Sequence, residues 1–495
     1  MKNFLYASVD GSQTTSSTSP KTVVHLEIPG DPRNPQDWAV IATWNAVADS
    51  PNPSLSQYYA EWDDGANQEV FAFSLIWETG PSNTHAMGGF HVIRDLSSNT
   101  DFNVRFLKLA GPGTKTTIKN ARILAIRIPK DARGTFKDAR TDYAASPVGT
   151  ELPPALVKSG WAPLRTRVDR GRYLVIGSID IDLPIVSSGT TVSAGLDVYR
   201  SIPDTSVAPK SSVVSNVLQV PPELAVSSGV NLRLARPLVK TRDQRHTFFC
   251  MGIAELDDEW VDVIMSAETD VSDSPNPLSV MSARTALIPL DGNWEYAYAN
   301  VPAQWSSDSG SSADIVEQAA FRRDEGQTKT AVRIGYVTVS HDAPAVGVGA
   351  EATIETHSGT VLGETEVENF GYDAGIAELP LVMMSDSASE PVRLRYREVG
   401  GVSPGSAVFS SGMLLTLVDH QSNQTSVPAS MAVGYDCDLS GVKDSVPIDA
   451  VHILHLLDIA NAGVPVPTLE VLEIVDEDFD RVRATVSDTL LWDNE

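Results

Sequence analysis

The chain has 495 residues, more than one ordinary domain of about 100–200 residues, so several domains are predicted. It carries 64 Asp and Glu against 37 Lys and Arg, a formal net charge of −27, and such a field repels nucleic-acid phosphates and anionic membrane surfaces. Hydrophobic residues make up 42% and charged residues 20%, as in folded rather than disordered chains. We therefore expect neither nucleic acid nor membrane as a partner.

The sequence has few cysteines and predicts no targeting signal. The only cysteines are Cys250 and Cys437, which excludes a disulfide scaffold and predicts two unpaired thiols in a protein assembled in a reducing cytoplasm. The apolar stretch before Asp10 is shorter than the core of a secretory signal, and no run approaches the length of a membrane-spanning helix. A soluble protein without a signal peptide is expected.

The first third of the chain predicts a series of strands separated by Pro, Gly and Asp turns. Apolar and β-branched residues gather in the segments 22–28, 38–44, 70–77, 102–106 and 121–128. Apolar residues often alternate with polar ones, which is typical of half-buried antiparallel strands. An acidic glycine turn at 63–65 precedes the third of these segments.

The same order of blocks returns near residue 285. The corresponding segments are 285–292, 294–299, 331–337, 391–396 and 412–418, and the repeat pairs Trp38 with Trp294 and Arg105 with Arg393. A weaker copy without the tryptophan lies between, with segments at 164–168, 173–179, 229–234 and 248–254. Tryptophans at repeated positions are expected to anchor cores. An arginine inside an apolar strand is expected to pair with a carboxylate or face a neighbouring subunit.

The tail breaks the repeat. A Ser/Thr/Asn linker is followed by a predicted short helix at 450–463 that ends at Gly463, and then by strands at 468–475 and 482–486. The sequence thus predicts an all-β protein with three tandem antiparallel β-sandwich domains of jelly-roll type and a small mixed C-terminal segment. The predicted boundaries are 1–138 for the first repeat, 139–268 for the second and divergent repeat, 269–421 for the third, and 422–495 for the C-terminal segment.

No constellation for metal or nucleophilic chemistry is found. The nine histidines are scattered without HExxH spacing, and His452 and His455 are assigned to the surface of the tail helix. Glycine motifs for phosphate or dinucleotide binding and a nucleophile elbow are missing from the sequence. The glycine pairs Gly88–Gly89 and Gly400–Gly401 are assigned to turns.

Neighbouring carboxylates could serve a glycosidase, which needs two of them about 5–9.5 Å apart across a cleft. They occur at 63–64, at 180 and 182, at 257–259 and at 476–478. Asp180 and Asp182 share one strand face, where a Ca²⁺ site is conceivable, but a chain with 64 acids contains such pairs by composition, and exposed strand acids are the favoured interpretation. We predict no catalytic, cofactor-binding or metal-binding residue, no cofactor and no enzymatic activity.

The repeated strand blocks, each closing with a strand such as 120–128, together with the acidic and nearly cysteine-free composition, resemble structural proteins of tailed-bacteriophage virions. The resemblance covers about 420 residues through the repeat. It implies a β-sandwich protein that decorates capsids, forms head fibres or builds tail parts, commonly as a trimer. Tandem sandwiches of this kind would form a rigid rod whose apolar outer faces are buried against other copies or a shell protein.

Three functions follow as hypotheses. The first is a non-enzymatic virion protein, a capsid-bound decoration or fibre component assembled in the host cytoplasm as a homotrimer and bound to the major capsid or tail protein. The second is a carbohydrate-binding adhesin or tail-fibre module for a host glycan, for which the nine tryptophans offer stacking rings. The third is a glycan-cleaving tailspike. An exposed aromatic platform would favour the second, and an aromatic-lined groove with paired carboxylates the third.

Overall fold

The computed structural model describes residues 3–48, 54–78, 83–110, 115–128, 136–142, 164–183, 191–200, 231–237, 244–257, 259–269, 279–291, 294–301, 305–306, 313–318, 330–341, 348–368, 375–385, 391–400, 407–418, 468–474 and 482–487. Every regular element in these ranges is a strand, so the all-β prediction is confirmed. No helix of the described residues is long and apolar enough to cross a membrane.

Three large antiparallel sheets contain most strands. Sheet A has the order β1 (Phe4–Thr15), β8 (Thr116–Ile128), β3 (Gln36–Ala48), β6 (Asn83–Leu96), β22 (Val361–Glu368), β21 (Val348–Thr356), β24 (Val392–Gly400) and β19 (Ala313–Gln318). Sheet B has the order β2 (Lys21–Ile28), β7 (Thr100–Ala110), β4 (Ser54–Asp63), β5 (Gln68–Glu78), β14 (Gln244–Leu256), β11 (Gly171–Leu183), β16 (Ser279–Pro289) and β9 (Lys137–Asp142).

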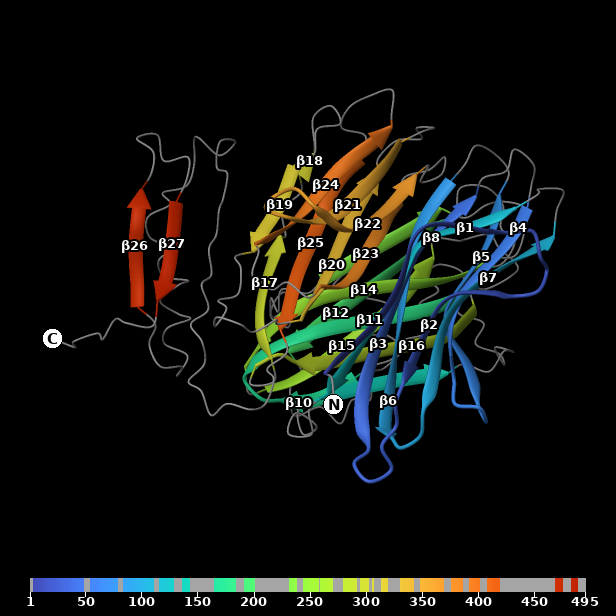
Figure 1. The fold of residues 1–495 in the computed structure, drawn as a ribbon, viewed down its shortest axis with the longest axis horizontal. Coiled ribbons are helices and arrows are strands. Elements are labelled where there is room, and N and C mark those ends of the chain that lie inside the picture. Colours follow the sequence, from blue (N-terminus) through green and yellow to red (C-terminus); the bar gives the residue numbers. More distant parts are fainter. Residues whose placement is uncertain are drawn as a thin grey trace.

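Sheet C has the order β10 (Leu164–Val168), β15 (Glu259–Thr269), β12 (Thr191–Arg200), β13 (Asn231–Pro237), β23 (Gly375–Ser385), β20 (Ala331–His341), β25 (Ala407–Val418) and β17 (Glu295–Val301). The short β18 (Trp305–Ser306) also pairs with β25. Strands β26 (Thr468–Ile474) and β27 (Val482–Ser487) pair only with each other and lie apart from the large sheets in Figure 1. Both tail strands were predicted, whereas the predicted helix at 450–463 lies outside the described residues.

Each large sheet is built from two halves that belong to different jelly rolls. Strands β1–β8 form the half-sheets β1-β8-β3-β6 and β2-β7-β4-β5, which is the strand order of an eight-stranded jelly roll with two Greek keys. Strands β9–β16 and β17–β25 repeat this order, with β18 as an addition. We call the three groups unit 1, unit 2 and unit 3.

The units are joined to one another in a closed ring. Sheet A joins units 1 and 3 where β6 meets β22, sheet B joins units 1 and 2 where β5 meets β14, and sheet C joins units 2 and 3 where β13 meets β23. One residue pair bridges each junction: Thr84 with Glu368, Ser74 with His246, and Ala235 with Ile376. Figure 1 shows the three sheets crossing within one body.

Side chains on the inner strands divide between two cores. In β3, Trp38, Val40 and Ala42 pack in the core of unit 1, while the alternating Ala39 and Ile41 pack in a central core. The central core also receives residues from unit 2 and unit 3, including Phe249 and Ile334. Units 2 and 3 have cores of their own as well. Strands such as β3 are therefore apolar on both faces, whereas β2 on the outside alternates buried with exposed residues.

This central core corrects the expectation of a rod. Among the described residues, apolar side chains on the outer faces of the sandwiches pack in a core shared by the three units of the same chain. Burial between units thus stabilises the chain without requiring a second copy.

Two equivalences predicted from the repeat have different outcomes. Arg105 lies in β7 and Arg393 in β24, the corresponding strands of units 1 and 3, as predicted. The pairing of Trp38 with Trp294 is wrong, because Trp38 lies in the third strand of unit 1 and Trp294 directly precedes the first strand of unit 3. The segment 285–292 was predicted to begin the third repeat. This is wrong, because most of it lies in β16, which pairs with β9 and β11 of unit 2. We therefore propose that unit 2 ends before residues 290–294 and that unit 3 begins after them.

Gly88 and Gly89 also require a correction, because they lie inside β6 and not in a turn. A Cβ atom on Gly88 would lie 2.4 Å from Cδ1 of Phe249, and one on Gly89 would lie 2.4 Å from Cβ of Ala72. Glycine in a strand interior permits such a close approach of another element. Gly88 lets the ring of Phe249 from unit 2 pack directly on a strand of unit 1, and Gly89 lets β5 approach β6 within unit 1.

We expect Gly88→Ala to lower the free energy of unfolding by about 1–3 kcal/mol, because the new methyl group overpacks a rigid ring. Denaturant melts measure the loss. Phe249→Leu in the same chain should recover part of it by making room. A variant as stable as the wild type would contradict the close packing at this junction.

Candidate functional site

Polar side chains gather where unit 1 meets unit 2, and a tight turn positions the first of them. In the turn between β4 and β5, the Asp64 carboxylate accepts hydrogen bonds from the backbone N–H groups of Ala66 (2.9 Å) and Asn67 (2.6 Å). These bonds hold the pKa of Asp64 below its ordinary value. Gly65 has a φ of +83°, which glycine adopts without strain. The turn sets the register in which Trp62 lies opposite Glu69.

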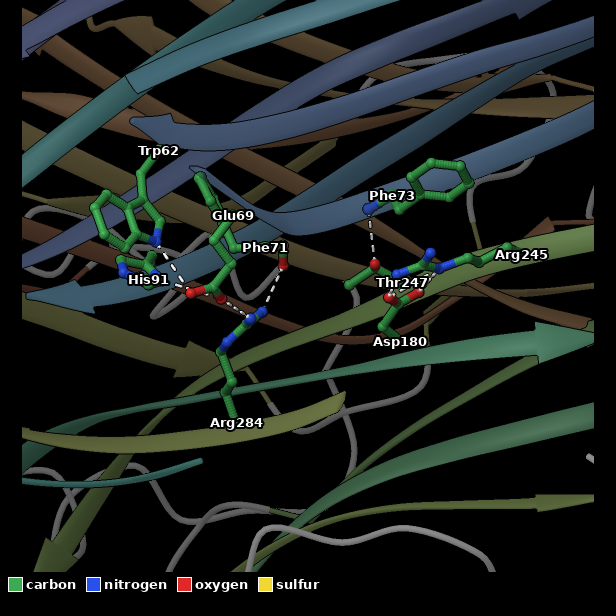
Figure 2. Close-up of polar contacts among 9 residues, drawn as sticks. All are labelled: Trp62, Glu69, Phe71, Phe73, His91, Asp180, Arg245, Thr247 and Arg284. Carbon is green, nitrogen blue, oxygen red and sulfur yellow. Dashed lines mark hydrogen bonds and ion pairs between the residues drawn. The ribbon is translucent and has the colours of Figure 1, made fainter. Parts of the chain in front are cut away.

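Glu69 is the centre of the first cluster (Figure 2). Its Oε2 accepts a hydrogen bond from the indole N–H of Trp62 at 3.1 Å, and its Oε1 lies 3.8 Å from Nδ1 of His91. The guanidinium of Arg284, from β16 of unit 2, forms an ion pair with the same carboxylate. Arg284 also donates through Nη1 to the carbonyl oxygen of Phe71 at 2.8 Å. One arginine, 5% exposed, thus links unit 2 to both a side chain and the backbone of β5.

A second cluster continues the same junction along β14 (Figure 2). The guanidinium of Arg245 binds the carboxylate of Asp180, with Nε 3.1 and 3.0 Å from the two oxygens, and lies 4.5 Å from the ring centroid of Phe73 in unit 1. The hydroxyl of Thr247 accepts the backbone N–H of Phe73 at 2.8 Å. Unit 1 is therefore held by a cation–π contact and a hydrogen bond besides the sheet pairing.

Burial raises the pKa of Asp180 above its ordinary value of 3.8, although Arg245 favours the ionised form. Because the folded chain then binds this proton more tightly than the unfolded chain, the contribution of Asp180 to stability falls as the pH rises above 3.8. We expect Asp180→Asn to make the free energy of unfolding decline less as the pH rises above about 4, because the variant has no carboxyl group to lose this proton. Denaturant melts of both proteins over a series of pH values test it, and identical pH profiles would contradict it.

The junction of units 1 and 3 is also bridged by a buried arginine. Arg122, 3% exposed on β8, donates through Nη1 to the carbonyl oxygen of Glu364 on β22 at 2.9 Å and through Nη2 to Asp10 at 3.0 Å. Lys119 pairs with the Glu366 carboxylate at 2.7 Å. In both junctions an arginine from the last strand of one unit reaches a backbone carbonyl on the neighbouring unit.

All three units meet at His246. It lies on β14 of unit 2 opposite Ser74 of unit 1, and its Nε2 is 3.7 Å from Oε1 of Glu378 on β23 of unit 3. The His246 and Glu378 side chains are both almost fully buried. The hydroxyl of Tyr336 in unit 3 donates to the carbonyl oxygen of Phe249 in unit 2 at 2.9 Å. Buried polar groups thus join units 2 and 3 as well.

The chemistry of these clusters is that of structural cross-links. Glu69, Asp180 and Glu61 each face an arginine, the last through Arg105 with Nε 2.8 Å from Oε1. In the described part of the chain, no group of three or more His, Cys, Asp or Glu side chains could hold a metal ion. The Glu69–Arg284 pair joins units 1 and 2, whereas Asp180–Arg245 lies within unit 2 and Glu61–Arg105 within unit 1.

The structure places the predicted candidates at separate positions. Asp63 and Asp64 form the β4–β5 turn, and Asp257 is exposed beside Arg170, 3.7 Å from its Nε. The prediction of exposed acids is wrong for Asp180, which is buried against Arg245. Arg105 pairs with a carboxylate, as predicted. Cys250 is buried and in no disulfide. The remaining candidates lie outside what the structure describes. They are the side chains of Asp182, Asp258 and Glu259, and the residues Gly401, Cys437, His452, His455 and 476–478.

Arg284 and Arg122 were not predicted from the sequence. Both stand in apolar strands, the same signal that singled out Arg105 and Arg393, and would have been found by applying it to every strand. Of the tryptophans, Trp38 and Trp44 are buried in the core of unit 1, while Trp260 on β15 is 41% exposed.

No protein-family model matches the chain, and no curated protein matches it either. Several solved structures resemble it. One concerns the triple jelly roll fold and turret assembly in an archaeal virus, with 10% identity over 80% of this chain and 81% of that chain, and a TM-score of 0.16. A second is the structure of infectious bursal disease virus, Gx strain, with 9% identity over 83% and 75% of the two chains and a TM-score of 0.19.

A third is a putative secreted protein of Parabacteroides distasonis, with 9% identity over 56% of this chain and 88% of that chain, and a TM-score of 0.16. Because all three TM-scores lie far below 0.5, the fold assignment rests on the strand order given above and not on these likenesses.

Proposed function

We propose that the protein is a non-enzymatic structural component of a virion, bound to the capsid as a decoration or fibre component. The observation that carries this proposal is the closed ring of three jelly rolls, joined by shared sheets around one core. Such a body gains rigidity from its pairing and burial, without disulfides among its described residues. Two of its buried ionisable pairs, Glu69–Arg284 and His246–Glu378, join different units.

The partners in this proposal are other virion proteins, such as a major capsid or tail protein, with assembly in the host cytoplasm. The homotrimer that the resemblance implied remains a prediction about how copies of the chain assemble. Burial among the three units of one chain stabilises each copy by itself.

Purified particles from the organism that encodes the chain provide the test. Mass spectrometry of the density-gradient particle band should find the chain at a fixed ratio to the major shell protein, and its density should be locatable in electron-microscopy maps of those particles. Recovery only from the particle-free fraction would overturn the proposal. The proposal would also be overturned if the protein released reducing ends from a polysaccharide and one Asp or Glu substitution abolished that release.

A carbohydrate-binding adhesin is the second candidate, and one observation favours it. Trp260 is 41% exposed on β15, where it lies opposite Arg167 of the edge strand β10. An exposed indole beside a hydrogen-bond donor suits a sugar ring. Glycan-array binding that Trp260→Ala abolishes, with the unfolding midpoint unchanged, would establish this function. Equal or no binding by both proteins would exclude it for this tryptophan.

A further inference from the structure

A lysine, an asparagine and a glutamate meet at the junction of units 1 and 3. Lys119 on β8 and Asn45 on β3 lie directly opposite each other in the ladder of sheet A. Opposite residues of neighbouring strands have Cβ atoms about 4.5–5.5 Å apart, which is well within the length of a lysine side chain. Glu366, on β22 of unit 3, contacts both residues.

The contacts of Glu366 hold the two unit 1 side chains together. Its Oε1 lies 2.7 Å from Nζ of Lys119, and its backbone carbonyl oxygen accepts a hydrogen bond from Nδ2 of Asn45, also at 2.7 Å. The same Nδ2 donates to the hydroxyl of Thr365 at 3.3 Å. Asn45 is 1% exposed, so these bonds hold its amide in one orientation. An amine, an amide and a carboxylate are thus fixed at one place, where proximity accelerates a reaction between them.

We propose that Lys119 and Asn45 become joined by an intramolecular isopeptide bond, with Glu366 carrying the protons. Glu366 first takes a proton from the ammonium group of Lys119, and the neutral Nζ attacks Cγ of Asn45. The Cγ–Nδ2 bond breaks as Glu366 passes its proton to Nδ2 and takes the second proton from Nζ. That proton leaves with the released ammonia as an ammonium ion. The products are one Nζ–Cγ amide, one ammonium ion and the original Glu366 carboxylate, and no oxidant or reductant is required.

The proton carrier belongs to a different unit from the two reacting groups. Lys119 and Asn45 are both in unit 1, whereas Glu366 stands on the strand of unit 3 that pairs with unit 1 through Thr84 and Glu368. The bond therefore forms only after units 1 and 3 have met, and it then ties β3 to β8 beside that junction. The Lys119 and Glu366 side chains are 31% and 22% exposed, which gives the ammonia a path to solvent. This inference concerns the chain alone and goes beyond the proposed virion role.

A second lysine beside an amide serves as the matched control. Nζ of Lys21 lies 3.4 Å from the amide oxygen of Gln13 and 3.3 Å from the carbonyl oxygen of Thr14. Its contacts in the described part of the chain include no carboxylate. Without a proton carrier, Lys21 and Gln13 should stay unlinked.

Mass spectrometry of the denatured full chain tests the inference. The wild type should be lighter than its sequence mass by one ammonia molecule. A tryptic digest should contain one linked pair of peptides that joins Lys119 to Asn45, without cleavage after Lys119, while Lys21 and Gln13 are recovered in unlinked peptides. A chain of full mass would overturn the inference. Loss of ammonia from Asn45 with normal cleavage after Lys119 would also overturn it, because that result indicates a succinimide.

Two conservative substitutions separate the reaction from the packing. Glu366→Gln keeps the size of the side chain but removes the proton carrier, and a positioned acid or base contributes about 10²–10⁴-fold to the rate of such steps. Lys119→Arg keeps a cation beside Glu366 but replaces the amine with a guanidinium, which is not deprotonated in proteins. We expect both variants to have the full sequence mass and wild-type circular dichroism.

The wild-type measurement stands even if one variant fails to fold, and the other variant then supplies the comparison. A linked pair that persists at the wild-type fraction in Glu366→Gln would overturn the role of Glu366 as proton carrier. Ammonia loss that persists in Lys119→Arg would show that it arises elsewhere, and would overturn the bond. None of these results bears on whether the chain is found in particles, so the two proposals fail separately.

Discussion

Arg284→Met should lower the free energy of unfolding by about 3–5 kcal/mol, the usual cost of removing one partner from a buried ion pair. The substitution keeps much of the aliphatic volume but leaves the Glu69 carboxylate without its cation and the carbonyl oxygen of Phe71 without the donor at 2.8 Å. Trp62 and His91 remain beside Glu69, but neither carries the permanent charge of a guanidinium. Guanidinium melts measure the loss as a lower midpoint at unchanged slope.

A double-mutant cycle separates the ion pair from the packing of the side chain. Glu69→Gln removes the orphaned charge, so Arg284→Met should cost less in that background, with a coupling energy of about 1–3 kcal/mol. The matched control is Arg397→Met, because Arg397 is 48% exposed on β24 and pairs with Glu351 inside unit 3. We expect that surface pair to contribute less than about 1 kcal/mol. Equal losses for both arginines would contradict a special role of the junction.

Trp38→Ala should lower the free energy of unfolding by about 3–5 kcal/mol, as for other large aromatic side chains truncated in a core. Trp38 is fully buried in the core of unit 1. The next residue of the same strand, Ala39, lies in the central core, so we expect the whole three-unit body to melt in one transition that shifts as a whole. A tandem rod would instead lose unit 1 alone and show a second, unshifted transition.

Two further substitutions test whether the loss of stability comes from the burial of Trp38. Trp38→Phe should cost less than Trp38→Ala, because a ring still fills the core and the buried indole N–H has no hydrogen-bond partner in the described structure. Trp260→Ala, at a position 41% exposed, should change the free energy of unfolding by no more than about 0.5 kcal/mol. A loss under about 1 kcal/mol for Trp38→Ala would contradict its burial.

Most strands could be predicted from the sequence because their signals are local. The segments at 22–28, 38–44, 70–77, 248–254 and 331–337 all fall within strands, and the acidic glycine turn forms between β4 and β5. The equivalence of Arg105 and Arg393 was also visible, since both stand in apolar strands of the same repeat block. Such patterns depend on side-chain alternation and turn residues within about ten positions.

The sites between units could not be predicted in the same way. Glu69 and Arg284 are separated by 215 positions and Arg122 and Glu364 by 242, so no spacing in the sequence connects them. The interpretation of Gly88–Gly89 failed for a related reason, because the ring that requires a glycine there belongs to a different unit. Asp180 was taken for a surface residue because its cation, Arg245, stands on a different strand.

The fold class, the succession of strands and the net charge of −27 could all be obtained from the sequence, because alternation, turn chemistry and composition are properties of short segments or of the whole chain. That the three sandwiches form a closed ring and not a rod follows from the order of the strands in the three large sheets. Among the described residues one ladder pair connects the two strands at each junction, and the apolar outer faces that the sequence left without a partner find one in the common core. An apolar face must be buried, but the pattern along a strand does not specify what covers it.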